Sequence, residues 1–538
     1  MIVTGKLLDI HAREIYPAAL HLKGRRISKI VRTVSCDDVF ILPGLIDAHV
    51  HIESSMLTPA EFANIAVTHG SVGAVADPHE IANVMGVEGV EFMIDNGKNT
   101  PFYFWFGAPS CVPATDLESS GAVLGYEEVK RLLEREEIKY LSEMMNYPGV
   151  INQDPGVIKK INESLKRGKP VDGHAPGLKG SDLRKYIDAG VSTDHECSTL
   201  EEAIEKIRLG MKIIIREGSA ARNLDNLKEL FNKYPSMLML CSDDIHPEML
   251  VQRHINKLVS LLVSEGYDVF DVMRACTLNP VNHYRLDCGL LREGDTADFI
   301  VVENLTEMDV RETWVAGKRI FGNGTVNFHT PGCVNVNRFN SSEITTDDLE
   351  IYPAKNRIRI IEAADGELLT GASVESVDGG GPLTSDTQRD LLKIVVKDRY
   401  DDAPPAVAFI RGFGLQKGAF ASSVAHDSHN IIATGTNDAD IVKAVNQIVR
   451  MQGGLSFADN DIIKSMKLEI GGIMANRPCR EVAEDYQQLS EIVKMAGCRL
   501  SAPYMTLSFM ALLVIPELKI SDRGLFDGIK FEYTSLFV

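Results

Sequence analysis

Residues 43–53 read PGLIDAHVHIE, a short apolar run that carries two histidines and is soon followed by an amphipathic segment, PAEFANIAVTHG. A strand-like run followed by a helix-like run then recurs as far as residue 284, which is the pattern of parallel βα units. Eight such units predict a TIM barrel over residues 44–284. The predicted strands are 45–53, 71–80, 102–110, 138–146, 170–176, 191–196, 211–220 and 236–244.

The segments on either side of the predicted barrel contain strand-like runs without regular helices between them. Residues 1–43 include TGKLLDI and AALHLKGRRISKIV, and residues 285–344 include GDTADFIVVENL and VRETWVAGKRIF. We expect these two segments to pair with each other in one small composite β-sandwich. Residues 345–538 mix strand-like runs with helices such as DADIVKAVNQIVRM, which predicts a separate C-terminal α+β domain after a polar connection.

Composition and charge narrow the class of protein. The chain of 538 residues carries 56 basic and 75 acidic residues, a formal net charge of -19. Binding to nucleic acid or to an anionic membrane depends on Lys and Arg, so neither is an expected partner. The nine cysteines form no Cys-x-x-Cys pair, and the N-terminus lacks the apolar core of a secretory signal. No charge-free apolar run reaches the ~18 residues of a membrane span, so we expect a cytoplasmic protein.

Metal-binding residue types fall at the ends of the predicted strands, where TIM barrels place their active sites. His49 and His51 are two residues apart on the first strand, so both imidazoles lie on one face. A lone histidine is more often structural than a ligand, and His-x-His alone is a weak motif, but residues from five strand ends together indicate a metal site. Nitrogen and oxygen ligands of this kind suit manganese, iron or zinc. The predicted ligands are His49, His51, Glu143, His174, His195 and Asp243.

Longer motifs resemble a known family. PGLIDAHVHIE and residues 275–303, ACTLNPVNHYRLDCGLLREGDTADFIVVE, resemble the two ends of the barrel in the amidohydrolase superfamily. Within it, HIESSM, DPHEIANVMG, REGSAARNL and SVAHDSHNI resemble bacterial and archaeal adenine deaminases over essentially the whole chain. Many binuclear members of the superfamily bridge their metals with a carbamylated lysine, whereas this chain offers Glu143, as an adenine deaminase would.

The resemblance implies an activity, a cofactor and an assembly. The expected reaction is hydrolysis of adenine to hypoxanthine and ammonia, as in purine salvage. The expected cofactor is a divalent metal centre, binuclear, with Mn2+ as first choice and Fe2+ or Zn2+ as alternatives. The expected assembly is a homodimer.

Deamination needs hydroxide at the purine C6, and a metal supplies it at neutral pH by lowering the pKa of bound water. We expect Asp243 to take the proton from that water and deliver it to the departing amine. His195 is included among the catalytic residues as well as the ligands. A second proton donor should activate the purine ring nitrogen, and Glu217, Glu53 and Glu80 are the candidates.

Other polar residues near the strand ends are candidates for holding the substrate. Asp244 could orient the purine or a ligand histidine, but a surface or capping role is as plausible. His79 could contact the purine or a metal, and the alternative is a capping role. Arg222 begins a helix and could equally face solvent. His426 and His429 lie in the polar loop 422–430, where a hydrogen-bonded turn is the simpler reading, and we hypothesise that this loop closes over a barrel mouth. The predicted substrate-binding residues are Glu53, His79, Glu80, Arg222, Asp244, His426 and His429.

Three alternatives stay open. One is another amidohydrolase with a cytosine, guanine or cyclic-amide substrate such as dihydroorotate, because the ligands alone do not decide the substrate. Another is a non-catalytic metal-binding protein, which would have no need to keep Asp243 beside every histidine. The third is a metal that supports redox chemistry, because a site of histidines and carboxylates can also hold redox-active iron.

Overall fold

The computed structural model describes residues 1–219, 221–377 and 380–538, so the last residue of the predicted strand 211–220 lies outside the described residues. The chain divides into two compact units. Unit 1 comprises residues 1–78, 91–110 and 125–332, and unit 2 comprises residues 79–90, 111–124 and 333–538. Two segments that follow barrel strands in the chain thus belong to unit 2. The predicted domain boundaries at residues 43, 284 and 344 stay predictions.

The predicted eight-stranded barrel is confirmed in unit 1. Its strands are parallel and pair in chain order, five in one ladder and three in another, and single β-bridges join β9 to β10 and β12 to β5. Each observed strand is shorter than its prediction, because the last residues of most predicted runs already belong to the loops that follow. The strands are β5 (Leu45–Val50), β6 (Ser71–Ala76), β7 (Tyr103–Ala108), β8 (Ile138–Met144), β9 (Val171–Gly173), β10 (Thr193–Asp194), β11 (Lys212–Arg216) and β12 (Leu238–Cys241).

Local sequence explains the barrel elements. All six residues of β5 and of β6 are buried, as expected for parallel strands with both faces covered. The Asp154 carboxylate accepts from the amides of Gly156 and Val157 at the start of α6, and Thr199 caps α8 in the same way. The helices of this region are α1 (Pro59–Ala66), α2 (His79–Met85), α3 (Val87–Gly97), α4 (Tyr126–Leu133), α5 (Tyr147–Ile151), α6 (Pro155–Lys166), α7 (Gly180–Asp188), α8 (Leu200–Arg208), α9 (Leu224–Leu227), α10 (Pro247–Gln252), α11 (Ile255–Ser264), α12 (Val269–Ala275) and α13 (Leu278–Tyr284).

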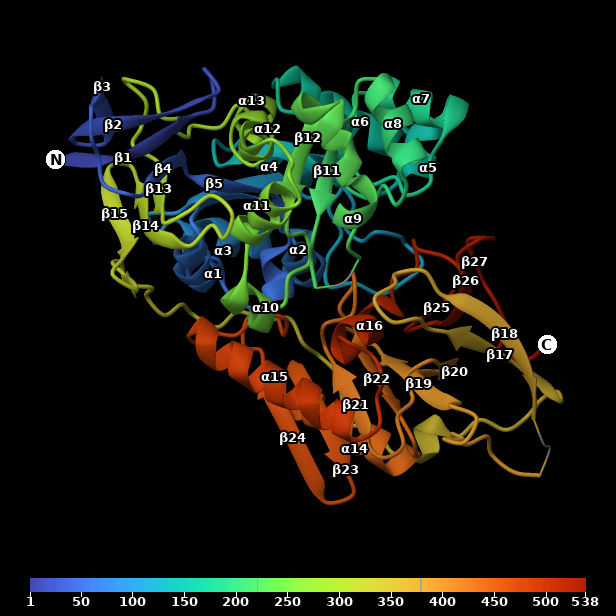
Figure 1. The fold of residues 1–538 in the computed structure, drawn as a ribbon. Coiled ribbons are helices and arrows are strands. Elements are labelled where there is room, and N and C mark those ends of the chain that lie inside the picture. The colour runs from blue at the N-terminus through green and yellow to red at the C-terminus, as the bar shows by residue number, and fades with distance from the viewer. Residues whose placement is uncertain (220, 378–379) are drawn as a thin grey trace. The chain divides into compact units, whose positions relative to one another are not determined.

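The two flanking segments share one eight-stranded sheet, as expected. β4 from the N-terminal flank pairs antiparallel with β13 from the other flank, and the N-terminal and yellow-green strands lie side by side in Figure 1. Phe299, Trp314 and Ile41 belong to its core. The strands are β1 (Ile2–Asp9), β2 (Glu14–Lys23), β3 (Arg26–Arg32), β4 (Phe40–Pro43), β13 (Phe299–Val302), β14 (Val310–Val315), β15 (Lys318–Gly322) and β16 (Thr325–Val326).

The C-terminal part of unit 2 has an eight-stranded sheet, a three-stranded sheet and three helices, so the predicted α+β class is confirmed. α14 packs on β21 to β23, while α15 crosses β23 and β24 (Figure 1). Its elements are β17 (Arg357–Glu362), β18 (Gly371–Ser376), β19 (Leu392–Lys397), β20 (Ala406–Arg411), β21 (Ala419–Ser422), β22 (Ile431–Gly435), α14 (Asp438–Met451), β23 (Gly454–Asp459), β24 (Ile462–Lys467), α15 (Cys479–Met495), α16 (Pro503–Phe509), β25 (Leu518–Ser521), β26 (Gly524–Asp527) and β27 (Glu532–Tyr533).

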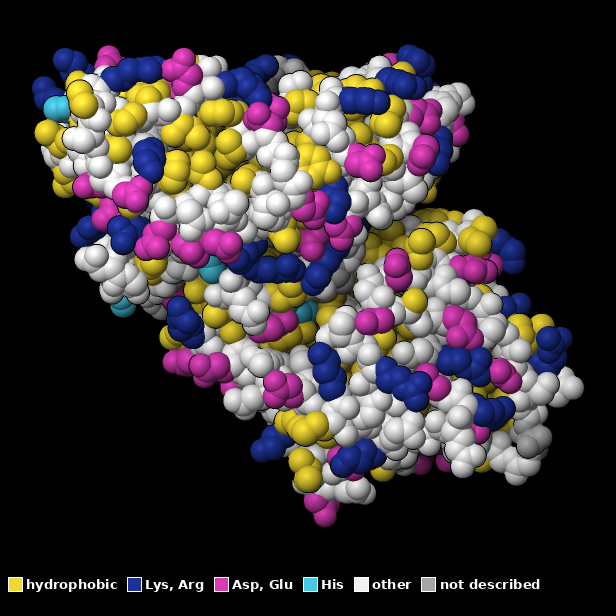
Figure 2. Space-filling view, viewed as in Figure 1, with side chains coloured by type: hydrophobic (Ala, Val, Ile, Leu, Met, Phe, Trp, Pro, Cys, Tyr) yellow, Lys and Arg dark blue, Asp and Glu magenta, His cyan; other side chains and the backbone are white. Residues whose placement is uncertain are grey.

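Figure 2 shows acidic and basic side chains interspersed over the face in view. None of the helices in the described ranges has the length and apolar character that crossing a bilayer requires.

Candidate metal centre and active site

The carboxyl ends of the barrel strands bring all six predicted ligands together in unit 1. His49 lies in β5 and Glu143 in β8, while the other four residues lie within three residues after their strands. Alternation along β5 places His49 and His51 on the same face. All six side chains are buried. The six residues are His49, His51, Glu143, His174, His195 and Asp243.

One group of ligands consists of His49, His51 and Asp243. The two Nε2 atoms are 3.1 Å apart, and Asp243 Oδ1 lies 3.4 Å from the first and 3.3 Å from the second. Adjacent ligands about 2.1 Å from one cation are roughly 3.0–3.4 Å from each other, so this spacing fits a shared metal ion. His51 Nδ1 donates to the Asp77 carbonyl at 3.2 Å, which directs the lone pair of Nε2 to the site.

A second group consists of Glu143, His174 and His195. Glu143 Oε2 lies 2.8 Å from His174 Nδ1 and 3.3 Å from His195 Nε2. The other oxygen, Oε1, lies 3.3 Å from His51 Nε2 in the first group. Glu143 therefore contacts both groups with separate oxygens. These residues fit a divalent metal, because buried imidazole nitrogens and carboxylate oxygens face one another at ligand spacing.

Among the residues of this centre that sequence reasoning missed are Glu196 and Arg216. Glu196 Oε1 lies 3.4 Å from His195 Nε2 and 3.5 Å from His174 Nδ1. Arg216 binds Glu196 through both terminal nitrogens, at 2.5 and 2.8 Å, and donates to Asp243 Oδ2 at 2.7 Å. Arg216 directly follows the apolar residues 213–215, so the sequence indicated that its side chain is buried. A buried arginine needs a carboxylate partner, and this was the signal that could have found it.

The carboxylates and the basic side chains of the centre stabilise one another's charged forms. Burial opposes ionisation of Asp243, but Arg216 and the neighbouring histidines hold its pKa well below its usual range. Burial also disfavours a charged His51, yet Asp243 and Glu143 raise its pKa well above the ordinary value. In the cation-free protein these carboxylates therefore favour protons on the histidines, and a divalent cation would replace those protons.

Four other predicted residues lie in unit 1. Glu53 is buried on the short helix of residues 52–55. Ser54 donates to Asp244 Oδ1 at 2.5 Å, and Asp244 can join His51 and Asp243 as a third metal-binding group. Glu217 lies 3.5 Å from Arg222 Nε, and burial raises its pKa. The Arg222 side chain is 46% exposed and donates to the Gly218 carbonyl, so its position also suits the solvent-facing alternative.

The remaining predicted residues, His79, Glu80, His426 and His429, lie in unit 2. Glu80 Oε1 lies 2.5 Å from His426 Nδ1, and Glu80 Oε2 contacts His429 Nε2. The amide of Ala425 donates to His429 Nδ1 at 3.3 Å, so the proton of a neutral His429 is on Nε2. His79 Nε2 lies 3.6 Å from Glu80 and 4.0 Å from Asp427. We call these five residues the Glu80 cluster.

The histidines of that cluster keep the carboxylate of Glu80 ionised. Burial alone would raise the pKa of Glu80, but His426, His429 and His79 hold it well below the usual range. Burial lowers the pKa of His429 to about 4 despite the nearby carboxylate. The cluster therefore contains an ionised Glu80 and a neutral His429 near neutral pH.

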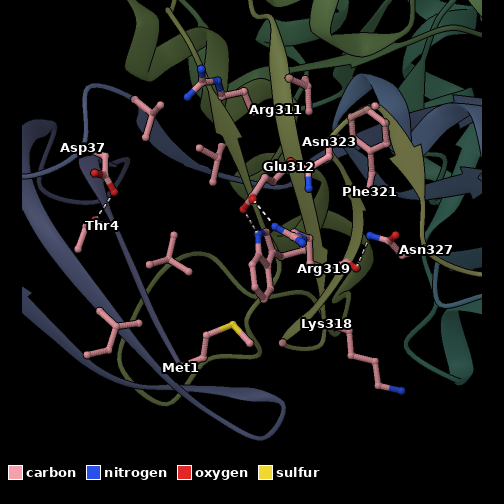
Figure 3. A pocket seen from close by; sticks show the side chains of 18 residues that line it. Met1, Thr4, Asp37, Arg311, Glu312, Lys318, Arg319, Phe321, Asn323 and Asn327 are labelled. Carbon is pink, nitrogen blue, oxygen red and sulfur yellow. Dashed lines mark hydrogen bonds and ion pairs between the residues drawn. The ribbon is translucent and has the colours of Figure 1, made fainter.

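A groove of about 1240 Å³ lies on the composite sheet of unit 1 (Figure 3). All of its lining residues come from residues 1–39 and 301–327, so it is separate from the ligands on the barrel strands. Glu312 accepts from Trp314 Nε1 and from Arg319, both at 2.8 Å, and these bonds occupy its centre in Figure 3.

Comparison with known proteins identifies the family. The model of the amidohydrolase family matches residues 40–320, and that of the adenine deaminase C-terminal domain matches residues 368–532. Adenine deaminase of Salinibacter ruber is 51% identical over 539 residues, covering 100% of this chain and 99% of that protein. The chain belongs to the adenine deaminase family. The family member of Methanosarcina mazei is 48% identical and covers 99% of both chains.

The 51% identity to the Salinibacter ruber protein confirms over the whole chain the family resemblance stated from HIESSM, DPHEIANVMG, REGSAARNL and SVAHDSHNI. A solved structure was also matched. N-acetyl-D-glucosamine-6-phosphate deacetylase of Mycobacterium smegmatis is 16% identical, with a TM-score of 0.47, and covers 60% of this chain and 100% of that one.

Proposed function

We propose that this chain hydrolyses adenine to hypoxanthine and ammonia at a binuclear centre that uses Mn2+, with Fe2+ and Zn2+ as alternatives. The observation that carries the proposal is the convergence of four histidines and two carboxylates at ligand spacing on the barrel of an adenine deaminase family member. The substrate is a small molecule. Assembly as a homodimer and a cytoplasmic location belong to the same proposal.

His49, His51 and Asp243 would hold one cation, and His174 and His195 would hold the other, with Glu143 between them. This assignment is supported by the two oxygens of Glu143, which face different groups of ligands. When bound, the cations lower the pKa of water and so supply a nucleophile at neutral pH. Glu196 is a further oxygen donor on the second side.

Asp243 acts as general base and then as general acid. It accepts a proton from the attacking water and passes it to the leaving amine, while the second water proton reaches the ring nitrogen. A C6–O bond forms and the C6–N bond breaks, which leaves hypoxanthine and ammonia. Arg216 holds Asp243 Oδ2, so Oδ1 is the oxygen that faces His49 and His51. His195, which stacks on His49 with ring centroids 4.3 Å apart, lines the same centre.

Glu217 is the preferred donor to the purine ring nitrogen, and it regains its proton from the second O–H of the attacking water. Its raised pKa favours a protonated carboxyl, whereas the lowered pKa of Glu80 favours an acceptor. Glu53 stays an alternative donor. Asp244 is placed to orient the substrate or His51, and Arg222 is the weakest of the proposed substrate contacts because of its exposure.

The Glu80 cluster serves substrate binding. The support is chain connectivity: α2, which carries His79 and Glu80, begins three residues after β6 ends, and β6 is a strand of the barrel. We therefore propose that residues 426–429 act at a barrel mouth, in the same or in a neighbouring subunit. His426 and His429 would hold Glu80 as an ionised hydrogen-bond acceptor for the substrate.

The test uses protein purified with Mn2+ after iron has been sequestered. Ammonia release is measured from adenine, adenosine, cytosine and guanine. Turnover of adenine alone supports the proposal. Turnover of a different base would leave the amidohydrolase class intact and overturn adenine, and no turnover of any base with two Mn2+ bound would favour the non-catalytic alternative.

A further inference from the structure

The barrel ladder is interrupted at two junctions, and the metal ligands lie on either side of them. Between β9 and β10 the strands share one isolated bridge, Val171 with Val191, and between β12 and β5 they share Val50 with Asp243. His49 and Asp243 face each other across the second junction. His174 and His195 face each other across the first. The spacing of each ligand pair therefore depends on a place where few main-chain hydrogen bonds join the strands.

Two fully buried carboxylates join the backbones at these junctions. Across β5 and β12, Asp47 Oδ1 accepts from the amide of Ser242, next to Asp243, at 3.0 Å, and from the amide of His49 at 3.4 Å. The Ser242 hydroxyl donates to Asp47 Oδ2. His254 Nε2 lies 2.9 Å from the same oxygen, and Ser71 Oγ lies 2.6 Å from His254 Nδ1. We call these four residues the Asp47 network.

Asp194 makes the corresponding contacts across β9 and β10. Its Oδ1 accepts from the amide of Ala175, next to His174, at 2.9 Å, and its Oδ2 from the amide of Glu196, next to His195, at 3.2 Å. Lys206 donates to Asp194 Oδ2 at 3.0 Å and to the Ala175 carbonyl at 2.8 Å. Asp194 and Lys206 are both 0% exposed. We call this pair the Asp194 network.

The ligand rings have few other groups to orient them. Metal-binding histidines usually donate their second ring nitrogen to a carboxylate or carbonyl. Among the residues that the structure describes, Nδ1 of His49, Nδ1 of His195 and Nε2 of His174 have no such partner. Their orientation must therefore come from packing and from the backbone that carries them, and the two networks hold that backbone.

We propose that Asp47 with His254, and Asp194 with Lys206, are positioning residues that set ligand spacing independently at the two cation positions. The Asp47 network controls the position of His49, His51 and Asp243, and the Asp194 network controls that of His174 and His195. This inference rests on the proposed binuclear function. Its tests measure metal binding, so their outcome does not depend on which base the enzyme hydrolyses.

The decisive measurement is calorimetric titration with Mn2+ of the folded, full-length protein after its metal has been removed. Asp47→Asn and Asp194→Asn should each weaken one of two sites by about 10- to 100-fold, which is the usual effect of losing an outer partner of a metal ligand, and leave the other site unchanged. His49→Ala and His195→Ala identify which site is which. The double variant should show both losses.

Paired substitutions separate positioning from general destabilisation. His254→Phe keeps a ring but removes both nitrogens, whereas His254→Gln keeps a donor near Asp47 and should restore most of the affinity. At the junction of β9 and β10, Lys206→Met removes the donor to Asp194 and Lys206→Arg keeps one, so Lys206→Arg should restore most of the affinity. These variants also keep the test open if Asp47→Asn or Asp194→Asn does not fold.

Asp172→Asn is the matched control. Asp172 is equally buried and lies two residues before His174, but its oxygens accept from side chains, Thr193 at 2.8 Å and Tyr284 at 2.7 Å. Its loss should lower the melting temperature and leave both Mn2+ affinities within about threefold of wild type. Equal weakening in Asp172→Asn, wild-type affinities in both network variants, or loss at the same single site from both would overturn the inference.

Discussion

Among the described residues, buried histidines and carboxylates gather both at the barrel strand ends and in the Glu80 cluster. At the barrel centre, His51 donates its Nδ1 proton to the Asp77 carbonyl, so the Nε2 lone pair faces His49 and Asp243. In the Glu80 cluster, His429 Nδ1 accepts from the Ala425 amide, so the Nε2 proton faces Glu80.

The difference lies in which ring atom carries the proton. Imidazole lone pairs and carboxylate oxygens that converge need a proton or a metal cation between them, whereas the N–H group of a neutral imidazole satisfies a carboxylate directly. The same residue types thus favour a metal centre in unit 1 and a hydrogen-bonded acceptor in unit 2. The backbone groups around each histidine decide which of the two arises.

Removal of the base at the barrel centre should have the largest effect. Asp243→Asn keeps the shape but loses proton transfer and a ligand charge, so kcat should fall by about 10³-fold or more. Ammonia release from adenine is the measurement. Asp225→Asn, an exposed position that contacts Lys228, is the matched control and should be active. An active Asp243→Asn variant would contradict the proposed role of Asp243 in proton transfer.

Mn2+ affinity should depend on the carboxylates of the barrel centre and not on those of the Glu80 cluster. Glu196→Gln should weaken Mn2+ binding by about 10- to 100-fold, because Glu196 faces both His174 and His195. Glu80→Gln should keep two Mn2+ with wild-type affinity. Mn2+ at 100 times its dissociation constant should stabilise the wild type by about 2.7 kcal/mol per site, seen as a rise in melting temperature. Loss of a Mn2+ equivalent in Glu80→Gln would break the comparison.

A substitution in the Glu80 cluster should affect the substrate and leave the metal in place. His429→Ala removes a donor to an ionised carboxylate, and it should raise KM or lower kcat by roughly 10- to 100-fold. Steady-state kinetics with adenine give the answer, and metal content should not change. His329→Ala, at an exposed position, is the control. Unchanged kinetics in His429→Ala would refute a role of the cluster in substrate binding.

Acid should reveal the charge state of His429. The pKa of His429 is about 4 in the folded protein and about 6.5 when unfolded, so the unfolded chain binds the extra proton between these values. Stability is therefore lost as pH falls from 6.5 to 4, by about 3 kcal/mol at 1.36 kcal/mol per pH unit. His429→Gln should flatten this part of the urea-denaturation profile. An unchanged slope would mean that His429 is not held neutral.

Much of the fold was predictable because its signals are local. Strand-like runs such as LIDAHVHIE have buried residues on both faces, and helix starts such as Asp154 have their caps beside them in the chain. Strand-end chemistry then gave His49, His174 and the other ligands. Arg216 and Glu196 were missed because their importance lies in bonds to each other and to Asp243, which are set by the barrel.

By itself the sequence determined the eight βα units, the residues that we propose as metal ligands, and the family. Only the tertiary structure shows the contacts of Asp47, of Asp194 and of the Glu80 cluster. Asp47 meets Ser242 across 195 residues of chain, and Glu80 meets His426 across 346. Periodicity and spacing report which face a residue occupies within one element, whereas hydrogen-bond polarity and ligand spacing depend on which distant backbone groups the closed barrel and the packed domain bring beside it.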